Sequence, residues 1–303
     1  MSATERDPEN VGNMGSIDQF FLAANAFPAM PEIARQIVAS VDDSGVGIDT
    51  VVRIAEQDPR FAADVLRLIR LVRPDRPPDG ACLADACADW SLEPLRDVIL
   101  FASIASAFPR ARIPDRVSLW SHAAATGSYA RWLSHYLHTD ADRAYLAGIL
   151  LRSGQIVIAR VMPDAVAHVE SACHAPGSRL RRELETIGCR HTDVTAELGR
   201  RWQLPQRLID GIRHTPDPLA AQPFSDLAAV LHVASLLADG GALGMSPAAS
   251  LSPPPPDDRR RPSRTGAQLL DSLQLDAAWL QTLAPHYTEL ADPVAQWLSA
   301  NPK

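Results

Sequence analysis

Residues 147–158 have the sequence AGILLRSGQIVI, an apolar stretch with the step Arg152-Ser153-Gly154 in its middle. Its second half, QIVIARV at 155–161, is rich in β-branched residues, as strands are. The run is short, however, and Gly154 and Pro163 bound it. We find no alternating run elsewhere in the chain with which it would pair as a strand. We therefore predict a buried helix here.

Helical spacing of apolar residues continues outward in both directions. Proline precedes two such runs, as Pro31 and Pro59, and at a first helical position it loses only an N–H that would have been unpaired. Asp58, directly before Pro59, is placed to accept from the free amides of the first turn. Runs with this spacing include 33–41, 61–72, 95–102, 117–137, 180–187, 194–202 and 269–297. The sequence therefore predicts an all-α fold.

Composition excludes several classes of protein. The chain has 303 residues, 46% of them hydrophobic, which is enough for one large core or two ordinary ones. A net charge of −7 and a pI near 5.7 disfavour nucleic acid as a partner. We find neither a signal sequence nor a membrane-spanning run, and we expect no membrane association and a cytoplasmic protein. The four cysteines form no C-x-x-C pair, so we expect reduced thiols.

One change in composition divides the chain. Residues 240–262, GGALGMSPAASLSPPPPDDRRRP, have no helical spacing. We predict a flexible N-terminus at 1–17, a helical domain at 18–239, a disordered Pro/Arg-rich insertion at 240–264, and helices at 265–303 that pack on the domain. The four prolines favour polyproline II, and with the arginines beside them they would suit a docking motif. A solvated surface insertion is the favoured interpretation.

Four phrases in the chain carry a family resemblance. They are FPAMPEIARQIV at 27–38, IAEQDPRFAADVLRLIR at 54–70, SLWSHAAATGSYARWL at 118–133 and HTDVTAELGRRWQLPQRLIDGIRH at 191–214. Together they resemble the HDOD family, the HD-related output domain of bacterial signalling proteins, which is a helical relative of the HD-superfamily metal phosphohydrolases. The resemblance implies an HD-superfamily-like helical bundle with N-terminal and C-terminal helical lobes in one HDOD domain.

The opening stretch departs from the catalytic pattern of that superfamily. The equivalent phrase in the catalytic superfamily resembles A-G-L-L-H-D-I-G. Alignment of AGILLRSG with that phrase places Leu151 at the histidine and Arg152 at the aspartate. The resemblance assigns the other metal-ligand positions to His122, His191 and His214, with Ser235 at the final aspartate. The predicted site is therefore a degenerate HD pocket that keeps three histidines and lacks both carboxylates and the central histidine.

The substitutions at Leu151 and Arg152 have a physical consequence. A hydrolytic metal site needs imidazoles and carboxylates that hold a dication and lower the pKa of a bound water. Leucine donates nothing, and a guanidinium about 5 Å from a dication costs about 6 to 7 kcal/mol at an effective dielectric of ~20. We therefore expect no metal, no cofactor and no catalytic residue.

The polar residues of this pocket have structural and functional interpretations. Buried histidines usually bond to a carbonyl or a carboxylate. Arg152 is expected to pair with an acid such as Asp142 or Asp193, or to lie exposed at a helix end; the functional alternative is contact with a phosphate or nucleotide. Zinc binding by Cys173-His174 with Cys189 and His191 is disfavoured, because adjacent ligands do not converge on one ion.

We therefore expect a non-catalytic regulatory protein of bacterial signalling, a free-standing adaptor whose partner is another signalling protein. Two alternatives stay open. One is a metal-dependent phosphohydrolase or cyclic-dinucleotide phosphodiesterase of the HD superfamily. The other is a nucleotide-sensing module with Arg152 as the anion contact.

Overall fold

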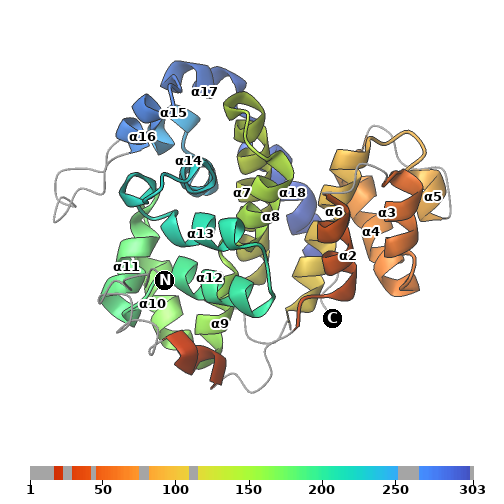
Figure 1. Ribbon diagram of the computed structural model, residues 1–303, viewed down its shortest axis with the longest axis horizontal. Coiled ribbons are helices and arrows are strands. Elements are labelled where there is room, and N and C mark those ends of the chain that lie inside the picture. Colours follow the sequence, from red (N-terminus) through yellow and green to blue (C-terminus); the bar gives the residue numbers. More distant parts are fainter. Residues whose placement is uncertain are drawn as a thin grey trace, which may run out of the picture.

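The structure is a computed structural model that describes residues 17–22, 29–41, 46–74, 82–108, 115–251 and 266–300. Every regular element within these residues is helical, as predicted. An N-terminal lobe consists of α2 (Glu32–Val41), α3 (Ile48–Ala55), α4 (Pro59–Val72), α5 (Leu83–Ala86) and α6 (Leu92–Ala107). It forms the right-hand part of the molecule in Figure 1.

The C-terminal lobe is larger. It begins with α7 (Arg116–Leu137), α8 (Ala141–Leu150), α9 (Ser153–Val161), α10 (Pro163–Ala172), α11 (Ser178–Ile187), α12 (His191–Arg201), α13 (Gln206–His214) and a short 3₁₀ helix, η2 (Pro218–Ala220). It ends with α14 (Asp226–Ala242), α15 (Pro247–Ser250), α16 (Gly266–Ser272), α17 (Ala277–Leu283) and α18 (Tyr287–Ser299). The long helix α7 packs against α8, α14 and α18.

Two local predictions from the sequence are confirmed. The Asp58 carboxylate accepts from the backbone N–H groups of Arg60 (2.9 Å) and Phe61 (3.3 Å), with Pro59 as the first residue of α4. The strand-like run at 155–161 forms the helix α9. Together α8 and α9 make one stretch, Ala141–Val161, that is long and apolar enough to cross a membrane, but 83% of the tested window is buried inside the protein. Its apolar character is therefore accounted for by core packing.

One hydrophobic core continues through both lobes. At its centre the fully buried Trp120 of α7 contacts the rings of Phe101 (5.9 Å between centroids) and Phe108 (5.6 Å). The last helix, α18, packs on both α7 and α4 (Figure 1). Its Trp297 donates from Nε1 to the Asp64 carbonyl (2.9 Å), which joins the C-terminal end of the chain to the N-terminal lobe.

The predicted boundaries of the flexible segments need correction. Ile17, assigned to the N-terminus, begins a helical stretch at 17–22. The predicted insertion also starts too early, because α14 continues to Ala242 and α15 forms before residue 252. Gly240 allows close packing of α14 against α15, since a Cβ there would lie 1.8 Å from Ser250 Oγ. The proline run at 253–256 and the arginines at 259–261 lie outside the described residues.

Candidate functional site

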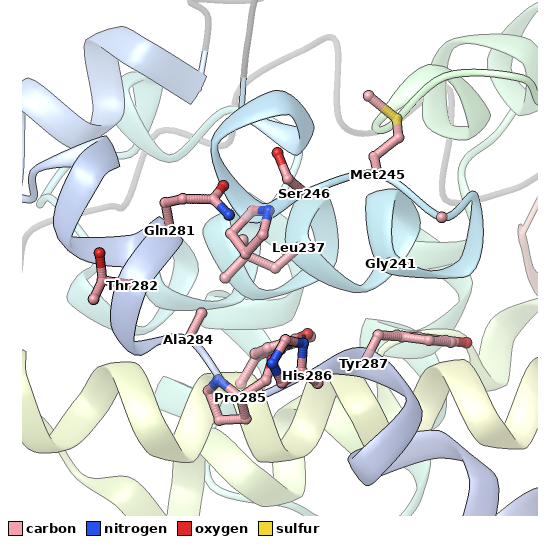
Figure 2. A pocket seen from close by; sticks show the side chains of 13 residues that line it. Leu237, Gly241, Met245, Ser246, Gln281, Thr282, Ala284, Pro285, His286 and Tyr287 are labelled. Atoms are coloured by element: carbon pink, nitrogen blue, oxygen red, sulfur yellow. Dashed lines mark hydrogen bonds between the residues drawn. The ribbon is translucent and has the colours of Figure 1, made fainter.

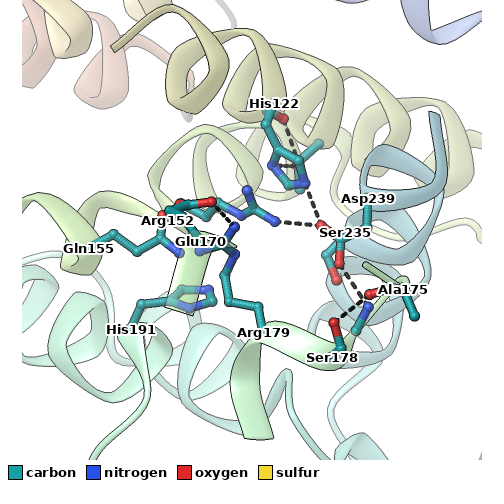
Figure 3. Close-up of polar contacts among 12 residues, drawn as sticks. His122, Arg152, Gln155, Glu170, Ala175, Ser178, Arg179, His191, Ser235 and Asp239 are labelled. Atoms are coloured by element: carbon teal, nitrogen blue, oxygen red, sulfur yellow. Dashed lines mark hydrogen bonds and ion pairs between the residues drawn. The ribbon is translucent and has the colours of Figure 1, made fainter. Parts of the chain in front are cut away.

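Arg152 lies at the turn between α8 and α9, where Leu150 ends one helix and Ser153 begins the next. The turn carries the side chain inward, and the guanidinium is only 11% exposed. Its Nη2 forms a salt bridge with Asp239 Oδ1 (Figure 3). The prediction that Arg152 pairs with an internal acid is therefore confirmed.

Neither acid that we named is the partner of Arg152. Asp142, in the first turn of α8, accepts from Arg131 (2.7 Å), and Asp193 accepts from the backbone N–H of Arg190 at the start of α12 (3.1 Å). Both acids are near Arg152 in sequence or in the expected fold, but each serves a local contact. The true partner comes from α14, 87 residues further along the chain.

Asp239 is bonded at both carboxylate oxygens. Besides Arg152, the ring nitrogen Nε2 of His122 lies 2.8 Å from Oδ1, and the Gly177 backbone N–H donates to Oδ2 (2.8 Å). Burial alone would raise the pKa of Asp239, but the Arg152 charge and the bonds from His122 and Gly177 outweigh it and hold that pKa well below its usual range. Asp239 is therefore an ionised, fully engaged carboxylate.

His122, on α7, is held in its neutral form. Burial, and then the charge of Arg152, lowers the pKa of the imidazole to about 4. The ionised carboxylate of Asp239 only accepts, so Nε2 carries the proton and donates to it. The other nitrogen, Nδ1, lies 3.1 Å from the Thr126 hydroxyl. The expectation that a buried histidine bonds to a carboxylate is confirmed for His122.

A second buried pair lies beside the first. His191, at the start of α12, bonds through its backbone N–H (2.8 Å) and Nδ1 (2.7 Å) to Glu183 Oε2. Gln155 donates to the other oxygen of Glu183 (3.1 Å). Burial raises the pKa of Glu183, but its bonds with His191 more than offset this, and the net shift is downward.

A third group, Arg179, brings another positive charge to the cluster. Its guanidinium binds Glu170 through two bonds, of 2.8 and 2.6 Å, and is 9% exposed, whereas the Glu170 side chain is 45% exposed. The pKa of Arg152 is lowered by burial first and then by the charge of Arg179. Figure 3 shows the two arginines near each other, between His122 and His191.

A close backbone contact requires a glycine at position 154. A Cβ at this position would lie 2.2 Å from the His191 carbonyl oxygen and 2.9 Å from the Thr195 backbone nitrogen. The Gly154 N–H donates to Thr195 Oγ1 (2.8 Å), whose hydroxyl in turn contacts the Leu151 carbonyl (2.8 Å). The backbones of α9 and α12 thus touch at this point, and this contact sets the turn from which Arg152 points.

The predicted pocket residues separate into two groups. His122, Arg152, His191 and Ser235 gather in one region (Figure 3), and Leu151 is buried in the turn beside them. Ser235 lies on α14 with its hydroxyl donating to the His232 carbonyl (2.9 Å). His214 is half-buried at the end of α13, and no hydrogen bond or ion pair among the described residues joins it to the cluster.

The prediction that both carboxylates are lost is therefore wrong in part. Asp239 lies one helical turn beyond Ser235 on α14 and brings a carboxylate to the pocket. It is an isolated acid in the apolar C-terminal half of α14, and this isolation is a signal that the sequence carried. Arg179 and Glu183 gave no such signal, because their helix, SRLRRELETI, carries many charged residues.

A metal ion does not fit the residues present. Among the described ranges, no group of three or more His, Cys, Asp or Glu side chains is arranged to hold one. Arg152 places its guanidinium against Asp239, which is therefore already neutralised by a cation. The oxygens of Asp239 are bonded by a cation and two N–H groups, so this carboxylate has little capacity left to act as a base or a ligand.

Comparison with known proteins agrees with this fold. The HDOD domain family model matches residues 27–218. An uncharacterised protein of Treponema pallidum (strain Nichols) is 23% identical over 215 residues, which are 69% of this chain but only 41% of that protein.

Solved structures cover most of the chain. An HDOD domain protein of unknown function from Geobacter sulfurreducens has a TM-score of 0.72, with 21% identity, over 93% of this chain and 97% of that one. A candidate signal transduction protein from Marinobacter aquaeolei VT8 has a TM-score of 0.69 at 21% identity, over 94% of this chain and 66% of that one. A candidate phosphohydrolase from Shewanella amazonensis SB2B has a TM-score of 0.67 at 21% identity, over 92% and 97%.

Proposed function

Because the chain belongs to the HDOD domain family, we propose that it is a non-catalytic, cytoplasmic signalling protein that regulates by binding another protein. The observation that carries the proposal is the salt bridge between Arg152 and Asp239. A positive side chain lies in the pocket where a catalytic dication would have to bind, and it is bonded to Asp239, a carboxylate of the same pocket. The pocket then serves to hold α7, α9 and α14 together, which leaves function to the surface.

A partly exposed aromatic cluster supports protein binding, because Trp132 and Trp279 are half-buried and Tyr136 is exposed. Trp132 of α7 and Trp279 of α17 stack with ring centroids 5.0 Å apart, and Tyr136 meets Trp279 at 4.5 Å. Tyr136 is 47% exposed, and Leu283, also on α17, is 49% exposed. Aromatic side chains are enriched in the buried centres of protein interfaces, where they contribute much of the binding energy.

The first experiment tests for catalysis. The purified full chain should contain iron, manganese or zinc well below one ion per chain and should not cleave a cyclic dinucleotide, with or without added metal. Stoichiometric metal, together with cleavage that a chelator abolishes, would establish the alternative of a metal-dependent phosphohydrolase. His122 and Asp239 are the two residues that favour this alternative, because both donor types persist in the pocket.

The second experiment tests partner binding. Tagged wild-type chain should recover a defined protein from the native host, and purified partner should bind the wild type directly. Tyr136→Ala should weaken that binding at least about tenfold, as for a truncated interface aromatic. Leu22→Ala, at a position that is 75% exposed on another part of the chain, is the matched control. Absence of any direct binder under several growth conditions would overturn the proposal.

A further inference from the structure

A pocket of ≈ 310 Å³ lies where the C-terminal helices close over α7 and α14. Its floor is formed by Tyr129 and Leu237, which are buried. Its rim includes Gln281, Thr282 and His286, which are exposed, so that the pocket opens to solvent on that side (Figure 2). The volume is at the lower end of the range of about 300–1,000 Å³ that small-molecule sites have.

Close packing of two helices shapes one wall of this pocket. Gly241 of α14 faces Tyr287 of α18, and a Cβ on Gly241 would lie 2.5 Å from the Tyr287 Cβ. The floor is fixed by a hydrogen bond from the Tyr129 hydroxyl to the Pro285 carbonyl (3.0 Å). A pocket held in this way by backbone contacts is formed before any ligand arrives, which lowers the entropic cost of binding.

The chemistry of the lining limits the charge of a ligand. None of the residues that line the pocket is Asp, Glu, Lys or Arg, and His286 is its one residue with an ionisable nitrogen. An anion would find no guanidinium or ammonium, and a cation would find no carboxylate. Burial of a charge without a partner is costly, so an uncharged ligand is favoured.

The same lining offers apolar faces and polar edges. Leu237 and the ring of Tyr129 provide apolar contact surfaces suited to a flat ring. Gln281 Oε1 accepts from the Ala248 N–H (3.2 Å), which holds the carboxamide in place and leaves its two Nε2–H donors for other acceptors. His286 adds a polar imidazole ring at the rim (Figure 2).

We propose that this pocket binds an uncharged planar heterocycle with hydrogen-bonding edges, the class to which the free nucleobases belong. Gln281 and His286 bind the polar edge, and Tyr129 and Leu237 contact the apolar face. The site lies beside the aromatic cluster, because both use α7 and α17, but it shares no residue with that cluster, and the proposal does not rest on partner binding there. It adjoins the degenerate pocket through α14, because Gly241 follows Asp239 by two residues.

The test is calorimetric titration of the full chain with adenine, hypoxanthine, cytosine and uracil, and with benzoate as a charged ring of similar size. We expect at least one base to bind and benzoate not to bind. Gln281→Leu should weaken binding of that base about tenfold by removing its hydrogen bonds. Ala284→Leu, which adds bulk to the lining, should abolish it.

Gln296→Leu is the matched control, because Gln296 is exposed on α18 and does not line the pocket. It should bind the base as the wild type does, and thermal unfolding should be compared for all variants. Binding of benzoate as tight as that of the bases, failure of all four bases to bind, or unchanged affinity in both Gln281→Leu and Ala284→Leu would overturn the proposal.

Discussion

Arg152 and Arg131 are both buried in the C-terminal lobe, to 11% and 12% side-chain exposure, but their acidic partners differ. Arg152 meets one carboxylate, Asp239, which His122 and Gly177 also bind. Arg131, by contrast, meets three carboxylates, those of Glu93, Asp97 and Asp142, at the junction of α6, α7 and α8.

The pKa values of two buried acids that pair with these arginines, Asp239 and Asp97, shift in opposite directions. The pKa of Asp239 is held well below its usual range by its donors, whereas burial raises the pKa of Asp97 to about 8. Arg131 counteracts that rise, but the charges of Asp142 and Glu93 add to it. A salt bridge by itself therefore does not keep a buried acid ionised; the number of donors to the carboxylate and the presence of other acids nearby also set its pKa.

The largest effect is expected from breaking the Arg152 pair. Arg152→Ala leaves the buried Asp239 charge without its cation and should lower the free energy of unfolding by about 3 to 5 kcal/mol. Urea denaturation measures this loss. The double variant Arg152→Met with Asp239→Leu removes both charges and should recover most of it. If Arg152→Ala is as stable as the wild type, the Arg152–Asp239 pair does not stabilise the fold.

The backbone beside Arg152 gives the next effect. Gly154→Ala drives a methyl group against the His191 carbonyl and should cost about 1 to 3 kcal/mol, as overpacked core sites do. Gly199→Ala, in α12, is the control, because its added Cβ would make ordinary contact at 3.4 Å, and it should be neutral or slightly stabilising. Equal unfolding midpoints for the two variants would contradict the close approach of α9 to α12.

The Arg131 group is tested through pH. Because the pKa of Asp97 is raised from 3.8 to about 8, the folded chain binds a proton there that the unfolded chain has lost. This contribution to stability is present below pH 4 and is lost as the pH rises to about 8. Asp97→Asn should therefore gain stability relative to the wild type across that interval, measured by urea denaturation at pH 5 and pH 8. A pH-independent difference would refute the raised pKa.

The smallest effect is expected at the exposed edge of the Arg152 region. Glu170→Gln removes a charge that is 45% exposed and keeps one acceptor for Arg179, so its cost should be at most about 1 kcal/mol. Salt should reduce the difference between wild type and variant, because exposed pairs are screened. A loss of unfolding free energy as large as that of Arg152→Ala would mean that the pair of Arg179 with Glu170 contributes as much to stability as the pair of Arg152 with Asp239.

The sequence by itself determined the helical fold, because helical spacing and caps such as Asp58-Pro59 act within a few residues. The phrase AGILLRSG also predicts that Leu151 and Arg152 stand at the position of the metal-binding pair, and this assignment stays a prediction. Only the tertiary structure decided which acid Arg152 meets, because Asp239 comes from a helix that is distant in sequence. The role of Gly240 and the convergence of Glu170, Arg179 and Glu183 likewise depend on how helices pack, which local spacing does not encode.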